Sequence, residues 1–154
     1  MSVRTIFLGC LLLFILAFVF SMPAYVLAPQ ELKQGTAVIG GKEITILVAD
    51  SARTITTGLG NRDSLDQDMG MLFVFPAPER HGIWMKNMRF PIDIFWIDEL
   101  GKIVDIEENI LPDTFPTVFL PKETDRYVLE TNAGFAKKEK IKRGDTLLFT
   151  VAKP

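Results

Sequence analysis

Two apolar runs in the middle of the chain constrain the fold more than any other feature. Residues 71–75 and 92–97 are apolar at successive positions, except for Asp93 in the second run. Successive side chains of a strand point to opposite faces of its sheet, so strands with these sequences are apolar on both faces. Such strands belong inside a sheet that is closed on itself or covered on both sides. We therefore expect a compact, β-dominated α+β domain whose mostly antiparallel sheet is barrel-like or doubly covered.

Most of the remaining sequence from residue 43 onward divides into short segments separated by turn residues. The alternation and the content of β-branched and aromatic residues predict strands at 43–49, 71–75, 83–88, 92–97, 102–107, 126–131 and 146–151. Two short helices are predicted, at 51–59 and at 133–138. Residues 109–121 contain three prolines and are predicted to form a long surface loop.

The first 28 residues predict a transmembrane helix or a signal peptide. The 23 residues from Ile6 to Ala28 carry no charge, and Arg4 precedes them. As a helix they would be about 34 Å long, enough to cross a bilayer core of about 30 Å. Pro29 follows the best cleavage position, which favours an uncleaved anchor over a cleaved signal. Arg4 favours a cytoplasmic N-terminus, so the domain is expected on the extracytoplasmic side, or secreted if the segment is cleaved.

Composition limits the remaining possibilities. We expect three parts, namely the membrane segment at 1–28, a linker at 29–42 and a single β-rich globular domain at 43–154. The net charge of −2 gives no basic surface for nucleic acid, so no nucleic-acid partner is expected. Cys10 and His81 are the only cysteine and histidine, which excludes the usual His/Cys metal sites, and we expect neither a metal nor a cofactor. His81 lies in a short turn and is predicted to be exposed to solvent.

Asp93 is the most informative candidate residue, because it interrupts a strand that is otherwise apolar. Strand alternation places it on the same face as Phe95. A buried carboxylate needs a partner, since burying an unpaired charge is very costly. The nearest donors in the sequence are Lys86, Asn87 and Arg89, which we expect to reach Asp93 across the sheet. The pattern fits an internal ion pair or hydrogen bond that fixes strand register, or a pocket carboxylate that acts as a general base or ligand anchor.

A second group of candidates is expected near Asp93. Trp84 and Lys86 share one face of the predicted strand 83–88, which suits a sugar, an acidic group or another small polar ligand. The alternative is an exposed strand face on which Lys86 covers Trp84. Glu130 and Asn132 share a face of a later strand and are expected to point into the same cavity as Asp93. The predicted ligand-binding residues are therefore Trp84, Lys86, Asn87, Asp93, Glu130 and Asn132.

A series of short motifs carries a resemblance to a known family. They are GL at 58–59, GMLFVF at 70–75, WMKNM at 84–88, PIDI at 91–94, YVLE at 127–130, NAG at 132–134 and GD at 144–145. In this order, over residues 43–150, they resemble the family called domain of unknown function 192. The resemblance implies a compact β-rich fold that is often exported or membrane-tethered, and it implies no established activity. The family usually has a Glu-Arg pair where this chain has Thr54-Ile55, and a methionine where it has Gly60.

Three functions fit these observations. The first is a membrane-tethered, extracytoplasmic binding or interaction module with a small polar ligand or a partner protein. The second is a hydrolase or transferase that acts on an envelope polymer through Asp93 and Glu130, which requires both carboxylates in one site. The third is a structural partner of another membrane protein, which an exposed apolar patch would favour. The absence of a recognisable catalytic motif favours the first of the three.

Overall fold

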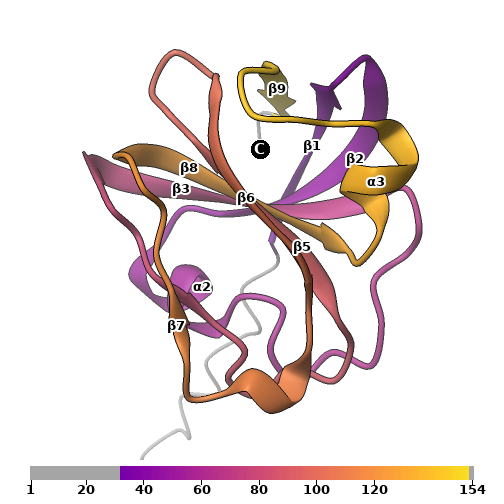
Figure 1. The fold of residues 1–154 in the computed structure, drawn as a ribbon, viewed down its shortest axis with the longest axis vertical. Helices are drawn as coiled ribbons and strands as arrows, with labels where there is room; N and C mark the ends of the chain where they lie inside the picture. Colours follow the sequence, from indigo (N-terminus) through magenta and orange to yellow (C-terminus); the bar gives the residue numbers. More distant parts are fainter. Residues whose placement is uncertain (1–31, 153–154) are drawn as a thin grey trace, which may run out of the picture. The chain divides into compact units, whose positions relative to one another are not determined.

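The computed structural model describes residues 32–152, and the predicted membrane segment at 1–28 lies outside them. No helix within residues 32–152 is both long and apolar enough to cross a bilayer. Along the chain (Figure 1) the elements are β1 (Lys33–Ile39), β2 (Lys42–Ala49), α2 (Ala52–Thr57), β3 (Met69–Glu79), β4 (Ile83–Trp84), β5 (Ile92–Ile97), β6 (Ile103–Ile110), the 3-10 helix η1 (Pro112–Thr114), β7 (Val118–Phe119), β8 (Asp125–Asn132), α3 (Phe135–Glu139) and β9 (Leu147–Val151).

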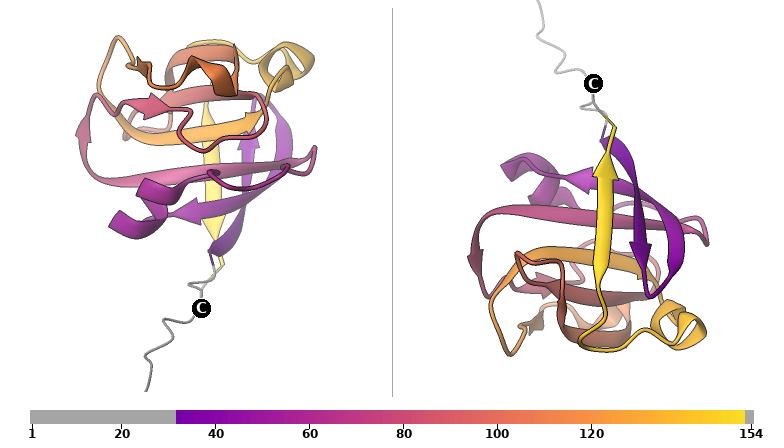
Figure 2. Two further views of the ribbon diagram at one scale, coloured as in Figure 1. Left: turned by 90° about the horizontal axis from the view of Figure 1, so that it is seen from below. Right: turned by 90° about the horizontal axis from the view of Figure 1, so that it is seen from above.

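Seven strands form one sheet in the order β6-β5-β8-β3-β2-β1-β9, and β4 pairs with β7 in a separate two-stranded ribbon. All pairs in the large sheet are antiparallel except β2 and β3, which are parallel and connected through α2. The expectation of a β-dominated, mostly antiparallel sheet with two short helices is thus confirmed. Figure 2 shows that the sheet is strongly coiled, since β1 and β9 run across the direction of β3.

The expected closed barrel is not supported. The order of strands leaves β6 at one edge of the sheet and β9 at the other. These edges approach each other at one end, where Lys102 and Thr146 form an isolated bridge and the Leu147 amide donates to the Gly101 carbonyl at 2.8 Å. Within residues 32–152 no strand ladder joins β6 to β9, so the sheet is coiled but open.

Both faces of the sheet are buried, as the sequence predicts for strands that are apolar on both sides. One face carries Met71, Phe73 and Trp96, and it packs against residues from the loop after α2 and from β4. The other carries Leu72 and Phe95, and it packs against α3 and the coiled end of the sheet. All six residues of β5 are buried, which explains its almost continuous apolar sequence.

The structure moves three predicted boundaries. Residues 33–39, placed in the linker, form β1, which pairs with both β2 and β9, so the domain begins before residue 43. The predicted strand 83–88 ends at Trp84, because Asn87 has a φ of 60° and turns the chain. The predicted loop 109–121 contains η1 and β7, and β7 pairs with β4.

Candidate functional site

A small pocket opens on the sheet face that carries Phe73, between the end of α2 and β4. Its volume is about 80 Å³, enough to admit water or a small polar group. It is lined by Ile55, Thr56, Thr57, Gly58, Leu59, Gly60, Phe73, Phe75, Gly82, Ile83, Trp84, Lys86, Met88 and Glu130. Half of these residues are apolar or aromatic and two are charged, a mixture that suits a small ligand with a polar end.

Glu130 supplies the buried polar group of this pocket. It lies on β8 between Met71 of β3 and Ile94 of β5, both of which are fully buried. Glu130 is 5% exposed and lines the pocket, and no hydrogen bond joins its side chain to another residue of 32–152. Because no fully buried side-chain oxygen or nitrogen in this range lacks a partner, the carboxyl oxygens of Glu130 reach solvent. Burial raises the pKa of Glu130 from 4.5 to about 8, because the apolar surroundings disfavour the carboxylate. At neutral pH the group is therefore mainly a protonated carboxyl, which both donates and accepts hydrogen bonds.

Trp84 and Lys86 lie in the pocket wall and are exposed to solvent. The Lys86 ammonium lies 5.4 Å from the centre of the Trp84 ring, a cation–π arrangement. Both residues line one pocket, which does not include Asp93, and they do so without sharing a strand, since Lys86 lies in the turn that follows β4. The aromatic ring and the ammonium group thus border the opening above Glu130.

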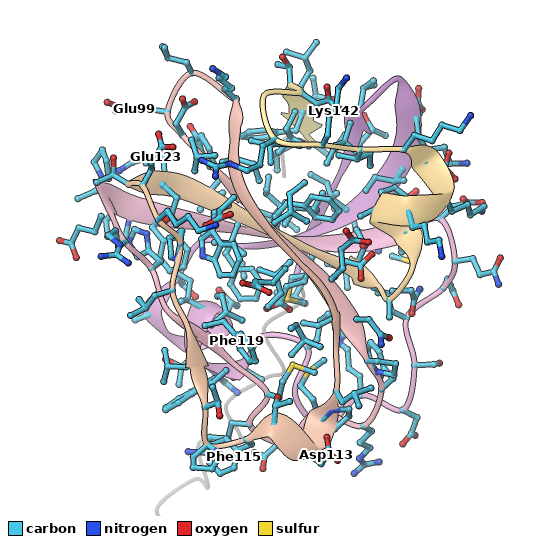
Figure 3. All side chains as sticks on the ribbon, in the orientation of Figure 1. Glu99, Asp113, Phe115, Phe119, Glu123 and Lys142 are labelled. Carbon is cyan, nitrogen blue, oxygen red and sulfur yellow. The ribbon has the colours of Figure 1, made fainter. Side chains whose placement is uncertain are left out.

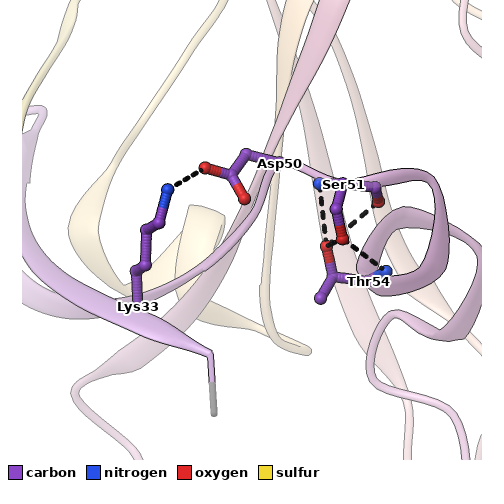
Figure 4. A network of polar contacts seen from close by, with 4 residues as sticks. All are labelled: Lys33, Asp50, Ser51 and Thr54. Carbon is purple, nitrogen blue, oxygen red and sulfur yellow. Dashed lines mark hydrogen bonds and ion pairs between the residues drawn. The ribbon is translucent and has the colours of Figure 1, made fainter. Parts of the chain in front are cut away.

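The opposite wall of the pocket is α2, and local contacts fix where this short helix begins. The Ser51 hydroxyl accepts a hydrogen bond from the Thr54 amide at 3.2 Å, and the Thr54 hydroxyl accepts one from the Ser51 amide at 3.0 Å. This reciprocal capping box (Figure 4) satisfies two amides at the helix start. Lys33 and Asp50 form an ion pair at 2.6 Å that ties β1 to the same point. Thr54 stands where the resembling family usually has glutamate, and it supplies half of this cap.

Glycines allow the chain after α2 to approach the pocket closely. Gly58 ends the helix with φ 50° and ψ −138°, a conformation that favours glycine. A Cβ atom on Gly60 would lie 3.2 Å from the Lys86 carbonyl oxygen. The Asn61 amide donates to the Asn87 carbonyl at 2.8 Å, which joins this segment to the turn that carries Lys86. Gly60 and Ile55, two positions that depart from the usual family pattern, both line the pocket.

Asp93 lies outside this pocket, and its partners are not those predicted. It is fully buried, and its carboxylate accepts hydrogen bonds from three backbone amides, those of Asn109 at 2.8 Å, Gly134 at 3.1 Å and Ala136 at 2.9 Å. The expectation that Lys86, Asn87 or Arg89 gathers around Asp93 is therefore wrong. Backbone amides at the start of α3 and at the end of β6 stabilise the charge instead.

Asp93 and Glu130 lie on opposite faces of the sheet. Asp93 is paired with Thr131, and Glu130 is paired with Ile94, in the antiparallel register of β5 and β8. Paired residues point to the same face and adjacent residues point to opposite faces, so the sheet itself separates the two carboxyl groups. The expected shared cavity of Asp93 and Glu130 is not present, and a two-carboxylate active site has no basis in this geometry.

The two predicted asparagines also lie away from the Glu130 pocket. The Asn132 side-chain amide donates to the carbonyls of Leu65 at 2.9 Å and Asp66 at 3.1 Å, and so holds the loop before β3. Asn132 lines a different, shallow depression beside α3. Asn87 is exposed and does not line the pocket. Of the six predicted residues, the structure brings together Trp84, Lys86 and Glu130.

His81 is not the exposed turn residue that was predicted. Its Nδ1 lies 2.7 Å from Oδ2 of Asp125, and its amide donates to Oδ1 of the same residue at 2.9 Å. The ring stacks on Phe75 with centroids 3.6 Å apart, and the Trp96 indole donates to the His81 carbonyl at 2.8 Å. Burial raises the pKa of Asp125, which His81 partly opposes. The two partners are 44 positions apart in the chain, which explains why sequence patterns miss this buried pair.

Apolar side chains are also exposed around the ribbon of β4 and β7. Phe115, Val118 and Leu120 are each exposed to about the same degree as Trp84, which is 47% exposed. In Figure 3 Phe115 lies at the outer end of this region, while Phe119 points toward the interior.

Within residues 32–152, no group of three or more His, Cys, Asp or Glu residues is placed to hold a metal ion.

Comparison with known proteins shows the family. The model of the DUF192 family, described as "Uncharacterized ACR", matches residues 35–149, from β1 to β9. The chain belongs to this family. The match covers every element that builds the Glu130 pocket, and it confirms the resemblance inferred from the motifs. It carries no activity with it.

Individual relatives agree with this assignment. A UPF0127 protein of Thermococcus gammatolerans is 29% identical over 83 residues, which are 53% of this chain and 52% of the relative, so the match spans about half of that protein. A crystal structure from Sinorhizobium meliloti, of a protein described as a candidate transcription regulator, has a TM-score of 0.75 and 29% identity over 79% of this chain and 98% of its own. A protein of unknown function from Novosphingobium aromaticivorans has a TM-score of 0.69 and 23% identity over 82% and 91%, and shows the same fold.

Proposed function

We propose that this DUF192 protein is a membrane-tethered, extracytoplasmic binding module that holds a small polar group in the Glu130 pocket. The observation that carries the proposal is the state of Glu130, a buried carboxyl that lines a pocket and has no partner among residues 32–152. Its carboxyl oxygens reach solvent and are not engaged by other residues of 32–152, so a bound ligand can replace their water contacts with hydrogen bonds. The tether is proposed from the apolar sequence before residue 29 and from Arg4.

The size of the pocket restricts what it can hold. A volume of about 80 Å³ is well below the roughly 300 Å³ of an ordinary small-molecule site, so only the end of a ligand fits inside. The remainder of the ligand would lie over Trp84, whose exposed ring offers a flat apolar contact. Binding without catalysis fits this site, because Glu130 is the only carboxyl group of residues 32–152 that lines it.

A fragment screen by NMR on the full-length chain in detergent micelles tests this function. We expect small polar fragments to shift the amide signals of Gly58, Gly60 and Lys86 together. Glu130→Leu removes the polar group while keeping an apolar side chain of similar length, and should abolish these shifts. Glu108→Gln, an exposed glutamate on β6, is the matched control and should leave them unchanged. Fragments that bind only elsewhere, or equally well to Glu130→Leu, would contradict the proposal.

A partner protein is a second candidate, favoured by the exposed apolar side chains of Phe115, Val118 and Leu120. Photo-crosslinking residues at positions 118 and 120 in native membranes would then yield one discrete adduct. Position 148 on β9 is the control, because Leu148 is more exposed still but lies on a different strand. The same adducts from position 148 would indicate nonspecific contact.

A further inference from the structure

The Glu130 pocket presents hydrogen-bond donors at neutral pH. Among its lining residues only Glu130 and Lys86 are ionisable. Burial raises the pKa of Glu130 to about 8, and its carboxyl group lines the pocket without a hydrogen bond to another residue of 32–152, so its O–H group is available as a donor. Apolar surroundings that hold a carboxylic acid neutral so that it donates a hydrogen bond are known from enzyme sites.

Lys86 supplies the second donor and the positive charge. Its ammonium contacts the ring of Trp84, and it forms no ion pair with any residue of 32–152. A cation–π contact at an exposed position is weak, so the ammonium is free to turn toward an anion at the pocket opening. A cationic ligand would meet repulsion from Lys86 and would require Glu130 to lose its proton.

We propose that the pocket binds a carboxylate on a slender, unbranched stem, with Glu130 donating its O–H and Lys86 its N–H groups to the carboxylate oxygens. This ligand class rests on the proposed binding function of the same pocket. Hydrogen bonds to an ionised acceptor are shorter and stronger than neutral ones. The volume of about 80 Å³ admits the carboxylate and one or two carbons, and the stem then leaves past Trp84.

Calorimetric titration of the full-length protein with propionate, at constant ionic strength and at pH 6, 7 and 9, tests the proposal. Because Glu130 must keep its proton, we expect similar affinity at pH 6 and 7 and about tenfold weaker binding at pH 9. Methylammonium, a probe of similar size and opposite charge, should show no binding. Pivalate, which carries a branched stem, should bind more weakly than propionate.

Two variants separate the roles of the donors. Glu130→Gln keeps an N–H donor at every pH, so propionate should still bind and the loss at pH 9 should disappear. Lys86→Ala should weaken binding at all pH values by about three- to tenfold. Lys137→Ala, an exposed lysine of α3 outside the pocket, is the control and should have no effect.

The possible outcomes distinguish the ligand class from the binding function. Tighter binding of methylammonium, with affinity that increases between pH 7 and 9 and is lost in Glu130→Gln, would overturn the carboxylate and leave the pocket's binding role standing. Propionate binding that Glu130→Gln and Lys86→Ala leave unchanged at every pH would also overturn it. Failure of both probes, together with a fragment screen that finds nothing at Gly58 and Gly60, would overturn the binding function as well.

Discussion

At the scale of single residues, Glu130 links the stability of the domain to pH. The unfolded chain ionises Glu130 above pH 4.5, whereas the folded domain keeps the proton until about pH 8. The unfolded state therefore binds fewer protons between these values, and the free energy of unfolding falls as the pH rises from 4.5 to 8 and is level above. The full loss is on the order of 5 kcal/mol.

Glu130→Gln cannot ionise, so it should remove this loss. We expect the variant to match the wild type near pH 4.5 and to exceed its stability at pH 9 by a similar amount, on the order of 5 kcal/mol. Urea denaturation at both pH values measures the difference, with Glu108→Gln as the exposed control. A difference that is the same at both pH values would contradict the assigned burial of the carboxyl group.

We expect Asp93 to affect the stability of the domain but not ligand binding in the Glu130 pocket. Asp93→Ala would leave the amides of Asn109, Gly134 and Ala136 without their buried acceptor. We expect a loss of about 3 to 5 kcal/mol in the free energy of unfolding, measured by urea denaturation. Ligand binding at Glu130 should be unchanged at temperatures where the variant is folded, because the sheet separates the two sites. Asp66→Ala, at an exposed position, should change stability little.

At the scale of elements, the capping box of α2 controls one wall of the pocket. The helix has only six residues and no acidic residue in its first turn, so it depends strongly on its cap. Ser51→Ala should destabilise the domain by about 1 kcal/mol and speed hydrogen exchange at the Thr54 and Ile55 amides. Ser64→Ala in the loop that follows is the exposed control. Unchanged exchange in Ser51→Ala would show that packing alone holds the helix.

The elements differ in how far the sequence determines them. The strands at 71–75 and 92–97 are predictable because their apolar runs fit only a sheet that is buried on both faces. β1 is missed because Lys33, Gln34 and Gly35 have little strand preference, and the strand is instead held by backbone pairing with β2 and β9. β4 ends early because Asn87 adopts positive φ, which side-chain alternation does not reveal.

The sequence identifies individual candidate residues of the site more readily than their neighbours in space. Trp84, Lys86 and Glu130, which line one pocket, stand out in the sequence because residues of these types are unusual beside a core strand. The partners of Asp93 are backbone amides, which no sequence pattern identifies, and the strand register that separates Asp93 from Glu130 depends on pairing between β5 and β8. The His81–Asp125 pair joins two segments that are distant in the chain and carries no local motif.

At the scale of the whole molecule, the two edges of the sheet meet where Gly101 passes Leu147. Gly101 has a φ of 82°, and a Cβ there would lie 2.7 Å from the Leu147 carbonyl oxygen. Gly101→Ala should cost about 1 to 3 kcal/mol for the backbone conformation and more for the contact, and it should increase hydrogen exchange at the Leu147 amide.

Gly134→Ala is the matched comparison for this substitution. Gly134 has a nearly identical φ of 84°, but a Cβ there would meet nothing within 4 Å. The difference in free energy of unfolding between the two variants therefore measures the contact between the edges. Equal losses would show that the approach of β6 and β9 adds nothing to the stability of the coiled sheet.

Asp93 on β5 and Glu130 on β8 also bear on the register in which these two strands pair. We expect the two buried carboxyl groups to favour the observed register. Apart from Asp93, β5 is apolar throughout, so a shift of β5 by one residue relative to β8 would still bury apolar side chains on both faces of the sheet. Such a slip would, however, separate the Asp93 carboxylate from its three amide donors. It would move the carboxylate to the sheet face of Glu130, where burial disfavours an ionised carboxyl group. We therefore expect the buried carboxylate of Asp93 to disfavour misaligned pairing of β5 with β8, which apolar packing alone would tolerate.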